Sequence, residues 1–347
     1  MVTPDIDYFR ALETPRLASL APNLVAAAFP LMKLMPARYI LDRAAAKGRV
    51  KSGSHVVETT SGTFGMAVAL LAAARSYRLT LVTASSLIDA KYRARLERIG
   101  ATVAALDDPR GDGNQPGRLE HVQRVLRDEP GCFWTRQYDS PGNWLAYARL
   151  ADLLIRSIGK IDCLVGCIGT GGSLCGTGRF LRTVFPHLTI VAVDTHYSIL
   201  FGQPVGRRML RGLGNSVLPA NVRHELVDDV HWVGAYLAYQ TAHRLLREHG
   251  LFMGPTSGAA ALVCQWVAEK RPDARVAVIM PDEGHRHADT VYNDDWLATL
   301  PGWPCQHMQE PETLAAIEPR AEWEWTRFAW ARRSLEDMLH SQKRGAA

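Results

Sequence analysis

The sequence predicts an α/β fold of two open, mainly parallel sheets, each covered by helices on both faces, with a cleft between the two lobes. From residue 54 onward, short β-branched runs alternate with helical segments, as parallel βαβ units require. The second half, from about residue 162, repeats this alternation after a polar, glycine-rich and proline-rich loop at 107–118. A chain of 347 residues with 47% hydrophobic residues is long enough to bury two cores.

The elements follow in order along the chain. The first half predicts strands at 54–60, 79–84, 100–106 and the apolar "CFW" (132–134), with helices at 63–76, 87–99, 118–128 and 142–158. The second half predicts strands at 162–168, 188–194 and 274–280, with helices at 173–184, 234–249 and 258–270. We therefore expect a large lobe of residues 1–45 with 142–295, and a small mobile lobe of residues 46–141.

The pattern changes after about residue 295. A proline-punctuated loop precedes a predicted helix at 319–340 that carries Trp323, Trp325 and Trp330. Two interpretations stay open for this extension, residues 296–347. The favoured one is a tail helix packed on its own subunit, and the other is a contact with a dimer partner, because aromatic anchors are enriched at interfaces.

Composition and charge exclude several classes of protein. The net charge of +5 comes from 40 basic and 35 acidic residues that form no long blocks, which argues against nucleic-acid binding. The sequence has no apolar run near 18 residues and no apolar segment at its N-terminus, so we expect a cytoplasmic protein without membrane contact. The six cysteines follow no CxxC spacing, which predicts free thiols and no metal site: Cys132, Cys163, Cys167, Cys175, Cys264 and Cys305.

A glycine cluster follows the predicted strand 162–168. Its residues are Gly169, Thr170, Gly171, Gly172 and Ser173, and a helix is predicted to begin there. Backbone N–H groups at a helix N-terminus can bind a phosphate, and glycine allows the close approach. The alternative is a tight structural turn. The GxGxxG spacing followed by an acidic residue, which a dinucleotide site requires, is absent from this stretch.

A second junction between strand and helix occurs at "ETTSGTFG" (58–65). Thr60, Ser61 and Gly62 stand where hydroxyl and N–H groups could hold a carboxylate. The alternative is a plain helix N-cap supplied by Thr60 or Ser61.

With these loops in this order, residues 14–295 resemble the cysteine synthase and cystathionine β-synthase family of pyridoxal-phosphate enzymes, the fold type II or tryptophan synthase β-like group. "TPRLASL", "PARYILDRAA", "VETTSGTFGMAVA" and "RLERIGATV" are similar to successive family segments, and so are "RQYDSPGNWLAY", "GTGGS", "RGLGNSVLP", "GPTSGAAAL" and "PDEGHRHADT". The resemblance implies a phosphate loop at 169–173, a substrate-carboxylate loop at 60–62 and a further polar contact from Gln137. It also implies a small amino-acid-like substrate and a homodimer.

The sequence departs from the family at the lysine that holds the cofactor. Aligning Pro36 and "DR" (42–43) with the family segment places Leu41 at the lysine position and Tyr39 at a small serine. Leucine cannot form an imine with the cofactor or move a proton. Lys33 is expected on a preceding strand-like segment, while Lys47 and Lys51 lie past the helix, so none of the three shares the register.

Two more positions differ from the family. Thr63 replaces the asparagine that bonds the pyridoxal oxygen, and Glu283 replaces the serine that faces the pyridine nitrogen, where a carboxylate would favour a protonated ring. "DEGHRHAD" also places His285 and His287 beside Asp282 and Glu283. This group could bind a metal or act as acid and base, but histidines of a surface loop are the favoured interpretation.

Three functional hypotheses follow. The favoured one is a divergent cysteine synthase-like enzyme that acts on an amino acid or a derived carboxylate without an internal aldimine, with pyridoxal phosphate bound noncovalently or absent. Glu283 and Tyr39 are its candidate catalytic residues. The second is a conventional β-replacement or β-elimination enzyme in which the local alignment is misplaced or a distant lysine supplies the amine. The third is a catalytically silent binding or regulatory subunit.

Overall fold

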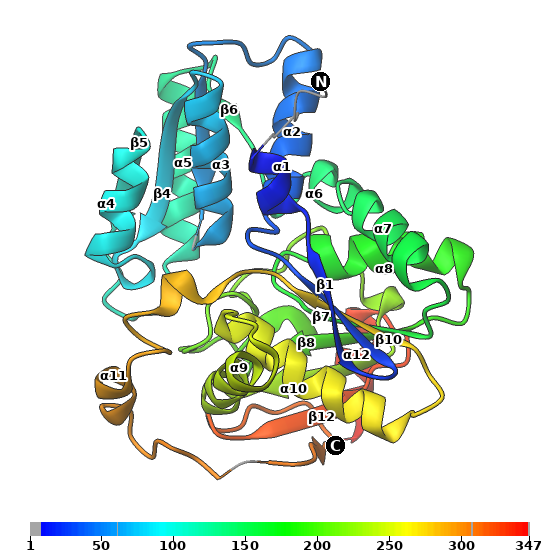
Figure 1. Ribbon diagram of the computed structural model, residues 1–347. Coiled ribbons are helices and arrows are strands. Elements are labelled where there is room, and N and C mark those ends of the chain that lie inside the picture. Colours follow the sequence, from blue (N-terminus) through cyan, green and yellow to red (C-terminus); the bar gives the residue numbers. More distant parts are fainter. Residues whose placement is uncertain (1–7, 61, 307, 346–347) are drawn as a thin grey trace.

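Two sheets organise the chain, one in each lobe (Figure 1). The computed structural model describes residues 8–60, 62–306 and 308–345. The large sheet has the order β1 (Arg16–Ala21), β2 (Leu24–Ala28), β10 (Val276–Met280), β7 (Cys163–Cys167), β8 (Thr189–Asp194), β9 (Asp229–Val233), β12 (Trp325–Ala329) and β11 (Glu312–Thr313). The small sheet has the order β5 (Ala101–Leu106), β4 (Arg78–Ala84), β3 (His55–Thr59) and β6 (Phe133–Trp134).

The predicted parallel α/β architecture is confirmed. Strands β2, β10, β7, β8 and β9 are parallel neighbours, and so are all the strands of the small sheet. Antiparallel pairs occur toward the edges of the large sheet, where β1 pairs with β2 and β12 pairs with β9.

Helices cover both faces of the large sheet because successive side chains of a strand point to opposite faces. Cys163 and Val165 of β7 pack in one core with α9 (Ala235–His249) and α10 (Pro255–Lys270). Leu164 of β7 packs in the other core with α7 (Ala148–Ile158) and α8 (Gly172–Val184). Alternate residues of each buried strand therefore supply two separate cores.

The small sheet is covered in the same way. Helices α2 (Leu34–Ala46), α3 (Thr63–Ala74) and α4 (Ala90–Arg98) pack in one core, and α5 (Gln115–Asp128) covers the opposite face. Most buried residues of α2 belong to this core and β2 belongs to the large sheet, so the segment 29–33 connects the two lobes.

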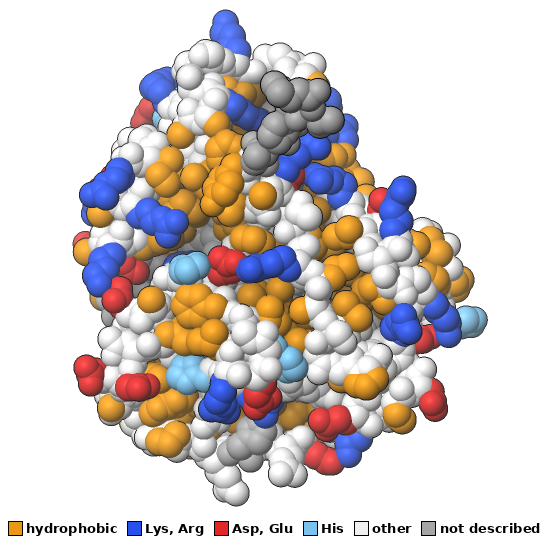
Figure 2. Space-filling view, viewed as in Figure 1, with side chains coloured by type: hydrophobic (Ala, Val, Ile, Leu, Met, Phe, Trp, Pro, Cys, Tyr) orange, Lys and Arg blue, Asp and Glu red, His pale blue; other side chains and the backbone are white. Residues whose placement is uncertain are grey.

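Short helices complete the chain: α1 (Tyr8–Glu13), α6 (Pro141–Leu145), α11 (Asp294–Ala298) and α12 (Leu335–Gly345). The predicted helix at 142–158 is divided into α6 and α7 at residues 146–147. None of the helices in the described part of the chain is long and apolar enough to cross a membrane. On the face shown in Figure 2, basic side chains are scattered among hydrophobic and acidic ones.

The helix predicted at 319–340 is wrong. This segment forms strand β12, which pairs with β9, and α12 begins only at Leu335. Trp325 and Trp330 are fully buried in the two cores of the large lobe, whereas Trp323 stays half exposed. Tryptophan, threonine and phenylalanine favour the pleated, half-buried surface of a sheet. The extension therefore packs on its own subunit through Trp325 and Trp330.

Candidate active site

A cavity of about 450 Å³ lies between the lobes. Its walls include four regions that are far apart in the sequence, the start of α2, the loop between β3 and α3, the loop between β7 and α8, and the segment 208–216, together with residues of several other segments. The carboxyl ends of parallel strands meet at this cavity, which is where open α/β sheets bind ligands.

Lys33 enters the cavity from the crossover between the lobes. It is the N-cap residue of α2, not part of a strand, and its Nζ lies 3.5 Å from Thr170 Oγ1. Desolvation lowers the pKa of the Lys33 ammonium to about 8, and attraction to Asp282 offsets only part of this shift. Lys33 therefore places an amine beside the glycine cluster, a position that the sequence alignment did not assign to it.

The structure places Leu41, which the alignment set at the amine position, away from the cavity. Leu41 lies eight residues beyond Lys33, about two helical turns, and its side chain is fully buried in the core of the small lobe. Tyr39 lies on the same helix, where its hydroxyl accepts a hydrogen bond from Arg43 Nη1 at 2.9 Å. Neither residue lines the cavity. The physical reason is the start of α2 at residue 34, which leaves Lys33 at the cavity and turns the later residues toward the core or the surface.

The glycine cluster forms a tight turn at the N-terminus of α8. Gly171 has φ +81°, and a Cβ there would lie 2.5 Å from the carbonyl oxygen of Asn221. A Cβ on Gly172 would lie 2.1 Å from Asn143 Oδ1. Gly169, Thr170 and Ser173 line the cavity, and the turn thus brings backbone and hydroxyl groups to one wall at a helix N-terminus.

The loop after β3 forms the opposite wall. Thr60, Gly62 and Thr63 line the cavity, whereas Ser61 lies outside the described residues. Thr60 Oγ1 accepts hydrogen bonds from the backbone N–H groups of Gly62 and Gly65, each at 3.1 Å. The Thr60 hydroxyl therefore supports the first turn of α3 through Gly65, although the N-cap residue is Gly62 rather than Thr60, and the loop faces the cavity.

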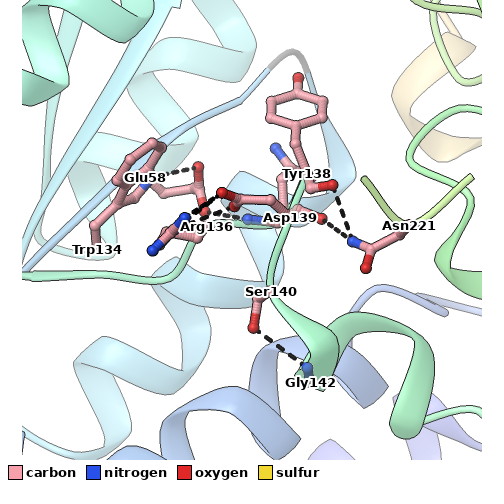
Figure 3. Close-up of polar contacts among 9 residues, drawn as sticks. Glu58, Trp134, Arg136, Tyr138, Asp139, Ser140, Gly142 and Asn221 are labelled. Atoms are coloured by element: carbon pink, nitrogen blue, oxygen red, sulfur yellow. Dashed lines mark hydrogen bonds and ion pairs between the residues drawn. The ribbon is translucent and has the colours of Figure 1, made fainter. Parts of the chain in front are cut away.

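Gln137 links the two lobes at the floor of this loop. Its side-chain Nε2 donates to the carbonyl oxygen of Thr59 at 2.7 Å. Its backbone carbonyl oxygen accepts from Asn143 Nδ2 and Asn221 Nδ2. Figure 3 shows the neighbouring contact, in which Asn221 also bonds the Tyr138 carbonyl. Gln137 lines the cavity, but its side-chain nitrogen already donates a hydrogen bond to Thr59 of β3.

Glu58, directly before this loop, was not predicted. Its carboxylate is fully buried and accepts hydrogen bonds from the backbone N–H groups of Thr59 and Gln137, at 2.7 and 3.1 Å, from Trp134 Nε1 at 3.2 Å (Figure 3) and from the Thr135 hydroxyl. Burial raises the pKa of Glu58 to about 7 although these four hydrogen bonds act in the opposite direction. A lone carboxylate in the apolar strand "HVVET" was the only sequence signal.

The structure places Glu283 outside the lining of the cavity. Its carboxylate forms an ion pair with Arg16 and lies 3.5 Å from His285 Nε2, and it does not line the cavity. Asp282 lines the cavity instead, because successive side chains of extended backbone after β10 point in opposite directions. Burial raises the pKa of Asp282 to about 6, while Arg286 and Lys33 oppose the shift.

The two histidines of the same segment are separated. His287 lines the cavity, whereas the side chain of His285 is largely exposed. Burial lowers the pKa of His287 to about 3, with repulsion from Arg286 as a second cause. Within the described residues, no group of three or more His, Cys, Asp or Glu side chains could hold a metal ion.

Four arginines also line the cavity and were not singled out from the sequence: Arg118, Arg208, Arg211 and Arg286. Arg286 reaches from the large lobe to Gly62, and its guanidinium lies 4.4 Å from the centroid of the Tyr92 ring. The cavity therefore combines one lysine amine, one helix N-terminus and several guanidinium groups, a set suited to a ligand with an aldehyde and several anionic groups.

Comparisons with known proteins show the family of the chain. The family of pyridoxal-phosphate dependent enzymes matches residues 32–282. The chain is 34% identical over 278 residues to N-(2-amino-2-carboxyethyl)-L-glutamate synthase of Ralstonia nicotianae, which covers 78% of this chain and 80% of that protein. The corresponding enzyme of Cupriavidus metallidurans is 33% identical over 276 residues, which cover 78% and 81% of the two chains.

Solved structures show the same fold. O-acetyl serine sulfhydrylase isoform 3 of Entamoeba histolytica superposes with a TM-score of 0.76 at 23% identity, over 86% of this chain and 95% of that one. O-ureido-L-serine synthase gives a TM-score of 0.73 at 27% identity, over 84% and 98%. The chain therefore belongs to the pyridoxal-phosphate dependent enzymes, within their cysteine synthase-like, fold type II group.

Proposed function

We propose that the protein is a pyridoxal-phosphate enzyme that joins the β-carbon of a serine-derived amino acid to the amino group of a second, acidic amino acid. The observation that carries the proposal is the position of Lys33 Nζ, which lies in the cavity beside Thr170 of the glycine turn. The two relatives above are named for N-(2-amino-2-carboxyethyl)-L-glutamate, in which such a three-carbon unit is attached to the nitrogen of glutamate.

The residues present fit the cofactor. The cavity supplies an amine and a helix N-terminus bordered by the hydroxyl groups of Thr170 and Ser173. Asn143 supports this turn without lining the cavity, since its Nδ2 donates to Thr170 Oγ1 at 3.1 Å. When bound, pyridoxal phosphate supplies an aldehyde that attaches amino groups and a ring that accepts negative charge from the substrate α-carbon.

Different residues of the chain would then bind the phosphate, bind the substrate and move a proton. The turn at 169–173 would hold the phosphate, and the loop of Thr60 and Gly62 would hold the substrate carboxylate. Lys33 Nζ would attach the cofactor aldehyde and, once released from it, take the proton from the substrate α-carbon. A lysine desolvated to a pKa of about 8 is a far better base near neutral pH than an exposed one.

This proposal replaces the interpretation that the cofactor is held without a covalent bond. That interpretation depended on Leu41 at the amine position, and Leu41 lies in the core. The position of Lys33 supports the second of the sequence hypotheses, a conventional pyridoxal-phosphate enzyme with the local alignment displaced.

Borohydride reduction tests the attachment. After incubation with pyridoxal phosphate and reduction, we expect peptide mass analysis to find the pyridoxyl group on Lys33. Lys47→Ala, which removes an exposed lysine at the end of α2, is the matched control and should still be labelled, whereas Lys33→Ala should not. Wild-type protein without label, or with label on another lysine, would contradict the proposal.

The attachment should also depend on pH. Only the neutral amine attacks an aldehyde, so the rate with cofactor-free protein should rise with pH and reach half its maximum near pH 8, the pKa of Lys33. An ordinary lysine would give this midpoint near 10.4. The growth of the visible absorbance of the lysine-bound cofactor after rapid mixing measures the rate, and a midpoint above pH 10 would refute the shift.

A further inference from the structure

Three arginines of the cavity have no role in the mechanism above. Arg118 comes from α5 of the small lobe, and Arg208 and Arg211 come from the segment between β8 and β9 of the large lobe. Arg118 and Arg208 are more than nine-tenths buried, and Arg211 is half-buried. Desolvation lowers the pKa of all three, and repulsion from Arg211 adds to the shift of Arg208 although Asp194 opposes it. Burying three positive charges around one cavity is costly unless an anion joins them.

The hydrogen bonds of two of these arginines go to neutral acceptors. Arg118 donates to the Gly113 carbonyl at 2.8 Å and to the Thr59 hydroxyl at 3.1 Å. Arg208 donates to the Tyr197 carbonyl at 3.0 Å and to the Ser216 hydroxyl at 2.9 Å. These contacts fix the position of the guanidinium groups and include no ion pair, although Asp108 and Asp194 offset part of their charges.

Arg211 differs from both. Across the described residues, its guanidinium takes part in no hydrogen bond and no ion pair, although it lines the cavity. A guanidinium carries five N–H donors in a planar fork that matches a carboxylate. Its donors therefore face the space that a ligand would fill.

Three of the carboxylates near the cavity already accept hydrogen bonds, whereas Asp282, which also lines it, has no hydrogen-bond partner for Oδ1 among the described residues. Asp89 caps α4 by accepting from the Tyr92 N–H at 2.7 Å. Asp112 accepts from the Asn114 N–H at 3.0 Å and lies 3.4 Å from Arg110. Asp108, the carboxylate whose charge raises the pKa of Arg211 the most, accepts from the Gly113 N–H at 2.8 Å. These carboxylates hold loops in place and form no ion pair with the Arg211 guanidinium.

We infer that Arg211, supported by Arg208 and Arg118, binds the side-chain carboxylate of the acidic amino acid that acts as nucleophile. The inference rests on the proposed function and goes beyond it by naming the residue that selects a dicarboxylate. The glycine turn and the 60–62 loop already account for the cofactor phosphate and for one α-carboxylate. A third anionic group is what the remaining guanidinium groups require.

The test compares L-glutamate with L-glutamine, which have nearly the same shape but end in a charged carboxylate and a neutral amide, respectively. Calorimetric binding to the cofactor-loaded protein is measured for wild type, Arg211→Met, Arg211→Lys and Arg207→Met, and the KM of each amino acid is measured with O-acetyl-L-serine and O-phospho-L-serine as first substrates. Arg207 is an exposed arginine of the same segment, so its loss controls for a general loss of positive charge.

We expect Arg211→Met to weaken the binding of L-glutamate about 10–100-fold, as the loss of a charge-assisted pair does. The binding of L-glutamine should weaken less than about 3-fold. Arg211→Lys should recover part of the affinity for L-glutamate. Arg207→Met should change the affinity for neither L-glutamate nor L-glutamine. Equal losses for both amino acids, or equal effects of Arg211→Met and Arg207→Met, would overturn the inference. So would a loss confined to the KM of O-phospho-L-serine, which would assign the guanidinium to a leaving group.

The binding measurement separates this inference from the proposed function. If wild type binds L-glutamate through Arg211 but forms no product from it, the subsite stands and the proposed reaction falls. If product forms from L-glutamate and L-glutamine with equal KM, the reaction stands and the subsite falls.

Discussion

Replacing Lys33 by alanine is expected to lower kcat by ~10⁴-fold, because the substitution removes both the amine that attaches the cofactor and the base that moves the α-proton. Lys33 Nζ lies 3.5 Å from Thr170 in the cavity. The assay follows product formation by mass spectrometry at saturating pyridoxal phosphate, with the serine derivative and L-glutamate as substrates.

A loss through misfolding has to be separated from a loss of chemistry. Lys47→Ala should keep nearly wild-type kcat, since Lys47 is exposed just beyond α2. Added methylamine should restore part of the rate of Lys33→Ala, because a small free amine can replace the missing base but cannot repair a misfolded lobe. A kcat within 10-fold of wild type in Lys33→Ala would show that another group supplies the amine.

The fold was predictable because its signals are local and recur in a fixed order. Apolar runs such as "CLVGC" and helices such as 255–270 are buried on nearly all sides, and their alternation is typical of parallel sheets. The extension was misread because "EWEWTRFAW" carries both charges and large apolar residues, and only the exposed edge of β9 decides that it becomes a strand.

The position of the cavity amine could not be obtained from local motifs. The alignment relied on Asp42 and Arg43, yet in the structure Asp42 pairs with Arg75 and Arg43 bonds Tyr39, contacts that many surface helices could carry. What fixes Lys33 is the start of α2 at the crossover between the lobes, and this start depends on tertiary packing. A lysine three residues before Pro36 was the available signal, because proline is common in the first turn of a helix.

The arginines show the same limit. Arg118 and Arg211 are 93 positions apart in the sequence and meet only because the cavity lies between the lobes. No periodicity brings residues of α5 and of the segment 208–216 together. That Arg211 forms no ion pair within the described residues is visible only when the partners of the neighbouring carboxylates are known.

Glu58 should make the stability of the protein depend on pH in a specific direction. Burial raises its folded pKa to about 7, whereas a free glutamate has a pKa of about 4.3, so the folded state binds a proton more tightly than the unfolded state. The contribution of Glu58 is therefore fully present below about pH 4.3 and is lost as pH rises through 7. Between pH 5 and pH 8, the loss should amount to about 2–3 kcal/mol.

The variant Glu58→Gln isolates this effect, because glutamine has nearly the same shape and does not titrate. Urea unfolding of both proteins at pH 5, 6, 7 and 8 gives the difference in free energy of unfolding, wild type minus variant, which should fall as the pH rises. Glu97→Gln, which removes an exposed carboxylate of α4, measures what the loss of one surface charge does at each pH. If the difference for Glu58 rises with pH instead, the four hydrogen bonds from Thr59, Trp134, Thr135 and Gln137 outweigh the desolvation, and Glu58 is a stable carboxylate that orders the substrate loop at neutral pH.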